Sequence, residues 1–242
     1  MGNIPKKVKG TTGVFAQLFS YHLLSYLWRF LRYGLLLFLL YVVIVLVHGT
    51  QTDFQPQAAT VLTIENPQPI APIADSTLRF FIWNLGYGGL GAKCNFFYSG
   101  GGSFLSGGKM VRPPKAIVDE NIAGATNILG KQKVDFYLLQ EVDKNSKRSY
   151  YINQYQQHNQ TTGGWPATYA SNYKVAAVPI PLLEPWKRYG KTESGLATFS
   201  RYMPQSAQRL QLPGDYGWPT RIFQLDRCLA LSLSFMGKRE TA

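Results

Sequence analysis

Two polar side chains, Asn84 and Glu141, follow strand-like segments at positions where metal chemistry is feasible. Asn84 ends the segment FFIWN, and Glu141 directly follows VDFYLLQ. When one helix joins two neighbouring parallel strands, the carboxyl ends of both strands emerge at the same edge of the sheet. A carboxylate and a carboxamide oxygen at that edge are hard ligands suited to Mg²⁺ or Mn²⁺. Judged by residue type alone, a pair of this kind is more often two structural polar residues at strand ends than a metal site.

The elements that must position these residues are indicated by composition and periodicity. Aromatic and β-branched residues predict strands, and apolar residues at helical spacing between Pro114 and Gly130 predict a helix. The predicted helix covers residues 115–129, and the predicted strands cover 78–85, 134–140, 196–200, 220–225 and 228–235. Residues 86–110 and 144–190 are predicted to be loops. This order of elements predicts an α/β or α+β layered domain.

Several motifs together resemble one enzyme superfamily. WN ends the first predicted strand, LLQEV ends the second, and SGLATFSRY follows later, with WNLGYGGLG, GGKMVRP and LDRC as further matches. Over residues 79–233 the chain is similar to the endonuclease/exonuclease/phosphatase superfamily, and more closely to a membrane-anchored bacterial group found in Bacteroidetes. The resemblance implies a four-layered sandwich, with two central sheets between outer helices. It also implies metal-assisted hydrolysis of a phosphodiester substrate, either nucleic acid or a phospholipid-like molecule.

The resemblance also implies roles for individual residues. Glu141 is expected to bind Mg²⁺ (or Mn²⁺), with Asn84 as its partner. The segment 195–201 is expected to line the cleft. Arg227 is a candidate phosphate clamp because guanidinium groups match phosphate bidentately, although an ion pair with Asp226 or Glu193 would explain it equally well.

A second group of candidate substrate-binding residues lies in the segment TYASNYKV. The resemblance implies that Tyr169, Asn172 and Tyr173 lie where the family places groups in contact with the scissile phosphate. The alternative for these residues is a packed aromatic segment.

The sequence departs from the family after Leu233, where the family's Asp-x-Asn and Ser-Asp-His motifs are missing. The chain has three histidines, His22, His48 and His158, and none is assigned as the general base. We therefore expect residues 78–242 to be the front part of a C-terminally truncated hydrolase domain that is inactive as it stands. The alternatives are a non-catalytic, membrane-tethered module that binds an anionic polymer or lipid, and a purely structural membrane protein.

The N-terminal segments predict a membrane anchor. Residues 1–32 contain five Lys or Arg residues and no acid, and residues 33–48 are almost entirely apolar. A transmembrane anchor over 33–48 is favoured over a cleaved signal, and the positive-inside rule places the N-terminus in the cytoplasm and the C-terminal domain outside it. Residues 14–31 are either a helix on the inner membrane face or the start of one long helix. Residues 49–77 are rich in Pro and Gln and are predicted to be a linker.

The charge and cysteine content limit the classes of partner and fold. The chain has 25 Lys and Arg residues against 13 acidic residues, for a net charge of +12. Such a chain favours an anionic partner, although a solvated basic surface is equally compatible with it. Its two cysteines, Cys94 and Cys228, exclude a dense disulfide framework. They are either free thiols or, outside the cytoplasm, one bridge.

Overall fold

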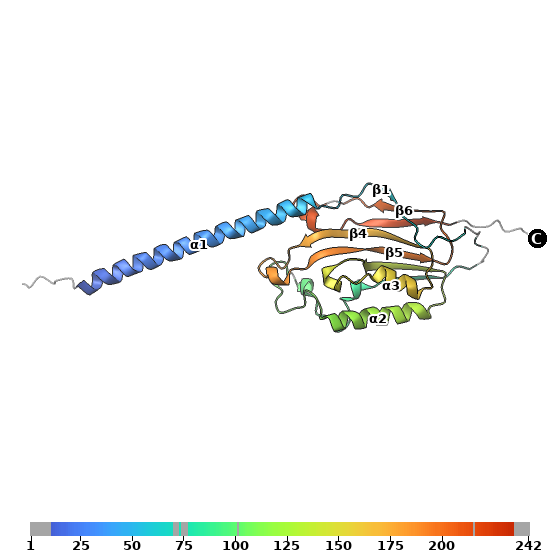
Figure 1. Cartoon of the computed structure of the whole chain (residues 1–242), viewed down its shortest axis with the longest axis horizontal. Helices are drawn as coiled ribbons and strands as arrows, with labels where there is room; N and C mark the ends of the chain where they lie inside the picture. Colours follow the sequence, from blue (N-terminus) through green and yellow to red (C-terminus); the bar gives the residue numbers. More distant parts are fainter. Residues whose placement is uncertain (1–10, 70–72, 74–76, 101, 215, 235–242) are drawn as a thin grey trace, which may run out of the picture. The chain divides into compact units, whose positions relative to one another are not determined.

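The computed structural model describes residues 11–69, 73, 77–100, 102–214 and 216–234 (Figure 1). The chain divides into two units, Met1–His48 and Gly49–Ala242. Both cysteines are free thiols.

One continuous helix, α1 (Thr11–Gln51), accounts for the described part of the first unit and extends three residues into the second. The part from Tyr21 to Gln51 is long and apolar enough to cross a membrane. Of the two interpretations of residues 14–31, the structure has the single long helix, because no proline interrupts the sequence from Thr11 to Gln51. Residues 1–10 of the predicted basic segment lie outside the described residues.

A four-stranded sheet carries the candidate site. Its strand order is β2-β3-β5-β4, in which β2 and β3 are parallel and the other pairs are antiparallel. The strands are β2 (Phe80–Asn84), β3 (Phe136–Asp143), β4 (Ala167–Val178) and β5 (Gly190–Ser200). Helix α2 (Lys115–Lys131) joins β2 to β3, so the carboxyl ends of the two strands lie at one edge, as the sequence predicts.

A second sheet consists of three antiparallel strands in the order β1-β6-β7. These strands are β1 (Ala59–Val61), β6 (Ser206–Gln211) and β7 (Cys228–Leu233). Residues 49–77, predicted to be a linker, therefore contribute an edge strand. They also form a backbone bridge between Glu65 and Ala167. The sequence does not predict this strand, because its segment is polar and rich in proline and because an edge strand of three exposed residues needs no apolar pattern.

The elements of this unit form layers. Helices α2 and α3 (Gln154–Thr161) lie on one face of the four-stranded sheet, and the second sheet lies beside the edge strand β4 (Figure 1). Between the sheets, buried Arg209 of β6 donates through Nε to the Ser171 carbonyl oxygen of β4 at 2.8 Å. The described residues thus form a mixed α/β unit with two sheets, in which the helices cover one sheet.

Short 3-10 helices occupy the connections: η1 (Gly86–Gly88), η2 (Phe97–Gly100), η3 (Lys147–Ser149), η4 (Pro185–Lys187) and η5 (Thr220–Phe223). Two predictions of secondary structure are wrong. Residues 220–225 were predicted to be a strand and contain η5. Residues 144–190 were predicted to be a loop and contain α3 and the 12-residue strand β4. Strand β4 was missed because it lies between β5 and the second sheet, and small or polar residues such as Thr168 and Ala170 therefore fill its buried positions.

The main core packs between the four-stranded sheet and the helices, and Phe199 is fully buried within it. We expect Phe199→Ala to lower the free energy of unfolding by about 3–5 kcal/mol, because it removes buried area and leaves a cavity. Urea unfolding of the full chain in detergent, followed by tryptophan fluorescence, would measure the loss. The exposed substitution Lys131→Ala is the control and should change stability by about 0.5 kcal/mol or less. Equal stabilities for the two variants would contradict the packing described.

The buried His158 of α3 predicts a pH dependence of stability. Burial lowers the pKa of His158 to about 4, and its Nδ1 lies 3.3 Å from Thr126 Oγ1. Because the unfolded chain takes up this proton near pH 6.5, stability should fall by about 3 kcal/mol as the pH drops from 6.5 to 4. The measurement is the urea midpoint between pH 4 and 7. His158→Gln should remove this component, and parallel curves for wild type and variant would contradict it.

Candidate functional site

Asn84 and Glu141 contact each other at the carboxyl edge of β2 and β3. The Asn84 side chain donates through Nδ2 to Glu141 Oε1 at 3.0 Å, and its Oδ1 accepts from the Gly86 N–H at 2.9 Å. Asn84 pairs in register with Gln140, the residue before Glu141. Both polar atoms of Asn84 are therefore engaged, and its amide group orients the Glu141 carboxylate.

Glu141 occupies an irregular position in β3. The pairing of β3 with β5 shifts register between Leu139 and Val142, and Glu141 has a φ of 53°. A non-glycine residue in the left-handed region costs about 1–3 kcal/mol and persists only where the surroundings impose it. The bulge breaks the side-chain alternation of the strand, so that Glu141 is half exposed while Leu139 and Val142 remain buried.

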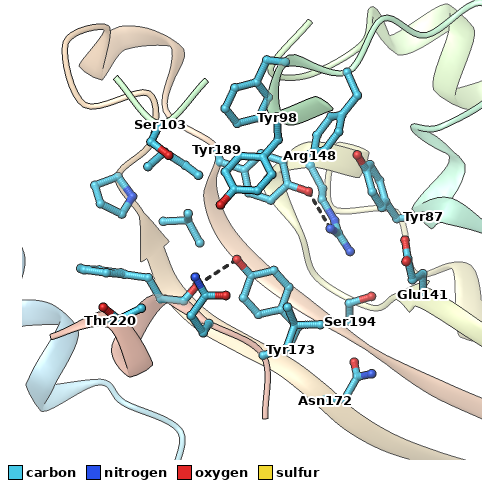
Figure 2. Close-up of a pocket in the computed structure, with 18 of the residues that line it drawn as sticks. Tyr87, Tyr98, Ser103, Glu141, Arg148, Asn172, Tyr173, Tyr189, Ser194 and Thr220 are labelled. Carbon is cyan, nitrogen blue, oxygen red and sulfur yellow. Dashed lines mark hydrogen bonds between the residues drawn. The ribbon is translucent and has the colours of Figure 1, made fainter. Parts of the chain in front are cut away.

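The Glu141 side chain opens onto a cavity of about 470 Å³. This volume is in the range of small-molecule sites. The cavity lies between the ends of the central strands and three loops, and most of its wall is apolar or aromatic. Four tyrosines line it: Tyr87, Tyr98, Tyr173 and Tyr189. In Figure 2, Glu141, Tyr87 and Arg148 lie on one side of the cavity, and Ser103 and Thr220 lie on the other.

A buried ion pair supports the wall beside Glu141. Arg148 binds Asp143 bidentately, through Nε at 3.0 Å and Nη2 at 2.8 Å, and its Nη1 donates to the Tyr189 hydroxyl at 2.6 Å. Ser149 Oγ donates to the same carboxylate at 2.7 Å. The guanidinium carbon lies 3.6 Å from the centre of the Tyr87 ring, a stacked cation–π geometry.

The charge state of this cluster follows from its contacts. Burial opposes the charged form of Arg148, but Asp143 and the neighbouring tyrosines outweigh it and hold the pKa of Arg148 well above its usual value. Burial also raises the pKa of Tyr87 and of Tyr189. The tyrosines are therefore neutral hydroxyls near pH 7, and Arg148 is a cation whose charge is offset by Asp143.

The other candidate residues divide into those that reach the cavity and those that do not. Asn172 and Tyr173 line it, and the Tyr173 hydroxyl donates to the Phe223 carbonyl oxygen at 3.1 Å. Tyr169 instead donates to the Val142 carbonyl oxygen at 2.8 Å, behind the wall. Arg227 is exposed and is not among the residues that line the cavity.

The segment 195–201 contributes mainly to packing. At Gly195, a Cβ atom would collide with the Ala170 carbonyl oxygen and lie 2.8 Å from Tyr169 Cζ, so glycine allows β4 and β5 to pass closely. Arg201 lies at the opposite end of the sheet, where its Nη1 is 3.4 Å from Asp135 Oδ1. The residue of this strand that lines the cavity is Ser194, next to Gly195.

The donor set at Glu141 fits one kind of metal binding and not another. Within the described ranges, no group of three or more His, Cys, Asp or Glu side chains converges as a metal site. One half-exposed carboxylate is compatible with a Mg²⁺ ion that retains water and is completed by phosphate oxygens of a ligand. It is not compatible with a cage made of protein ligands alone. His158 is buried against Thr126, away from the cavity.

Sequence reasoning named Asn172 and Tyr173 as candidates, but it missed the residues that build the cavity wall beside Glu141. Asp143 and Arg148 follow directly after the motif LLQEV, yet their pairing has no recognisable spacing. Tyr87 and Tyr189 are more than a hundred residues apart in the chain. The available signal was the presence of an acid and an arginine directly after a buried strand, which is too common to assign a role.

We expect the Asp143–Arg148 pair to behave as a unit. Arg148→Met should lower the free energy of unfolding by about 3–5 kcal/mol, because it leaves a buried carboxylate without its partner. The double variant Asp143→Leu/Arg148→Met should lose less than the sum of the two single variants. A double-mutant cycle of urea unfolding in detergent measures this coupling, and strictly additive losses would contradict it.

Comparisons with known proteins find no relative of this chain. A scan against protein-family models, a search of the curated proteins and a search of the solved structures each return no match.

Proposed function

We propose that this chain is a membrane-anchored, metal-dependent phosphoester hydrolase of the endonuclease/exonuclease/phosphatase type. One observation carries the proposal: the Glu141 carboxylate, oriented by Asn84 at 3.0 Å, faces a ligand-sized cavity at the carboxyl ends of two parallel strands. Ligands of open α/β sheets bind at such strand ends.

The charges around the cavity support a role for a cation. Glu141 and Arg148 are the charged residues among those that line it, and Arg148 is paired with Asp143. The remaining charge is therefore negative and would repel a bare phosphate. A Mg²⁺ (or Mn²⁺) ion at Glu141 reverses this repulsion and, when bound, acts as a Lewis acid on a phosphoryl oxygen.

The proposed roles of the chain's own residues follow from their positions. Glu141 binds the ion, and Asn84 fixes the orientation of the carboxylate. Asn172 and the hydroxyl groups of the tyrosines are hydrogen-bonding partners for the phosphate or its substituent. Arg148 acts through Tyr87 and Tyr189 and is a positioning residue.

A second candidate function is a non-catalytic module that binds an anionic polymer or lipid. It is favoured by one observation, that no His or Asp is found among the described residues lining the cavity. In both functions the apolar part of α1 anchors the chain. The five basic residues before it favour a cytoplasmic N-terminus and a second unit on the other side of the membrane.

The test uses the full chain in detergent micelles with a panel of phosphodiesters: single-stranded DNA, RNA and phospholipid. We expect hydrolysis that requires Mg²⁺ and is abolished by EDTA; an absence of turnover would instead agree with the expectation from the sequence that residues 78–242 are inactive as they stand. Glu141→Gln should remove the metal-dependent activity, and Asn84→Ala should weaken metal affinity by about 10–100-fold, as expected for a residue that orients a ligand. The control is Glu120→Gln, an exposed carboxylate on α2 that should leave activity unchanged.

Binding measurements on the same variants separate the two candidate functions. Mg²⁺-dependent binding of a phosphodiester without turnover would support the binding module. Ligand binding that ignores both Mg²⁺ and Glu141→Gln would exclude the proposed site altogether.

A further inference from the structure

Three loops around the mouth of the cavity expose large apolar side chains. These rim loops are residues 102–106, 179–189 and 216–225. Six of their aromatic and leucine side chains are 46–74% exposed: Phe104, Leu105, Leu183, Trp186, Tyr216 and Trp218. Exposed apolar groups gathered at one place mark an interaction surface more often than a solvated one.

The rim loops form one surface. The N–H groups of Leu182 and Leu183 donate to the carbonyl oxygens of Ser103 and Phe104, each at 3.0 Å, so the first two loops run side by side. Ser103, Leu182 and Thr220 line the same cavity, which brings the third loop to the same mouth (Figure 2).

The third rim loop is bonded to the residues that follow the apolar segment of α1. Trp218 Nε1 donates to Thr50 Oγ1 at 3.1 Å, and Arg221 Nη2 lies 3.1 Å from Asp53 Oδ2. At Gly49 a Cβ would lie 2.8 Å from Ile222 Cδ1, so this loop packs directly on the chain there. Gly49, Thr50 and Asp53 all belong to the second unit.

The chain distance from the apolar segment to these bonds is short. Thr50 and Asp53 are three and six residues beyond Val47. At 1.5 Å per helical residue, and at most about 3.5 Å per extended residue, this separation is on the order of 5–20 Å. When the apolar segment spans a bilayer, the third rim loop is therefore held within reach of the headgroup layer, which is about 5–8 Å deep on each side.

The composition of the rim loops suits that position. Trp and Tyr are enriched where membrane meets water, because their rings are apolar and their tips are polar. The loops with their immediate flanks, residues 102–112, 179–191 and 216–227, contain seven Lys or Arg residues and two acids, Glu184 and Asp226. Anionic lipid headgroups attract such an excess of positive charge.

We infer that the rim loops dock onto the surface of the membrane that anchors the chain, so that the cavity opens at the lipid headgroup layer. The inference rests on the proposed membrane anchoring and does not depend on catalysis. A second copy of the chain would also cover apolar side chains, but it would not explain why the aromatic surface is bonded to the residues that follow the apolar helix.

The test measures the depth of single sites in the full chain. In a Cys94→Ser/Cys228→Ser background, Trp186→Cys and Trp218→Cys are labelled with the fluorophore NBD and reconstituted into nanodiscs of phosphatidylcholine and phosphatidylglycerol. The control is Lys133→Cys, an exposed site before β3, at the end of the sheet opposite Glu141. Circular dichroism of each variant verifies that it is folded. We expect blue-shifted emission and at least twofold stronger quenching by doxyl-labelled lipids at 186 and 218 than at 133.

The remaining outcomes overturn the inference in distinguishable ways. Quenching at 186 and 218 as weak as at 133, without blue-shifted emission, would show that the rim loops stay in water. Blue-shifted emission without lipid quenching would show that a second copy or another protein covers them. Alkaline extraction of native membranes tests the premise separately: a chain released by carbonate is not anchored, and then both the anchoring and the docking fail. A chain that resists extraction but shows no quenching refutes the docking alone.

Discussion

The buried pair of Asp143 and Arg148 is the interaction on which the candidate site depends. Taking two charges out of water costs several kcal/mol for each ion, and this cost is offset only when the geometry is good and the remaining polar atoms are bonded. Here both carboxylate oxygens and all three guanidinium nitrogens have partners, including Ser149 and Tyr189. The end of β3, η3 and the start of β5 are therefore fixed by one charge-assisted network.

The position of Glu141 follows from this network and from the pairing of β2 with β3. Asp143 must face the interior to meet Arg148, and Val142 is buried beside it. Leu139 and Val142 both belong to the main core although they are three residues apart, and regular alternation would place them on opposite faces of the sheet. Strand β3 therefore takes a bulge between them, whose left-handed residue is Glu141, and Asp143 follows on the face opposite to Val142. On the neighbouring strand Asn84 lies in register with Gln140 and holds the displaced carboxylate. Packing in the core therefore fixes the bulge in β3, and the bulge in turn places the Glu141 carboxylate at the cavity.

The sequence predicts the parts of this arrangement that are local. Strands β2 and β3 and helix α2 follow from composition and periodicity. Their order alone places Asn84 and Glu141 at one edge, and their side chains contact there. The apolar part of α1 is equally easy to predict from the sequence. Strand β4 was missed because it lies between β5 and the second sheet, so that small and polar residues are buried in it and no apolar pattern marks it. Strand β1 was missed because an exposed edge strand has no apolar pattern to detect. The part of the cavity wall beside Glu141 was missed because Tyr87, Arg148 and Tyr189 come together only through tertiary contacts.

The distribution of charge around the cavity separates long-range from short-range recognition of an anionic ligand. Residues 78–242 contain 20 Lys or Arg residues and 10 acidic residues, and the rim loops with their flanks share that positive excess, so an anion is attracted toward the mouth. Inside, the walls are largely apolar, Arg148 is neutralised by Asp143, and Glu141 is left with its negative charge. In such surroundings the repulsion between Glu141 and a phosphate is stronger than it would be in water. In the proposed function, a divalent cation bound at Glu141 would make the short-range interaction with a phosphate favourable. In the proposed function, the apolar walls would bind the rest of the ligand by buried area and aromatic contact, so a phosphoester that carries an apolar or aromatic group would bind better than inorganic phosphate.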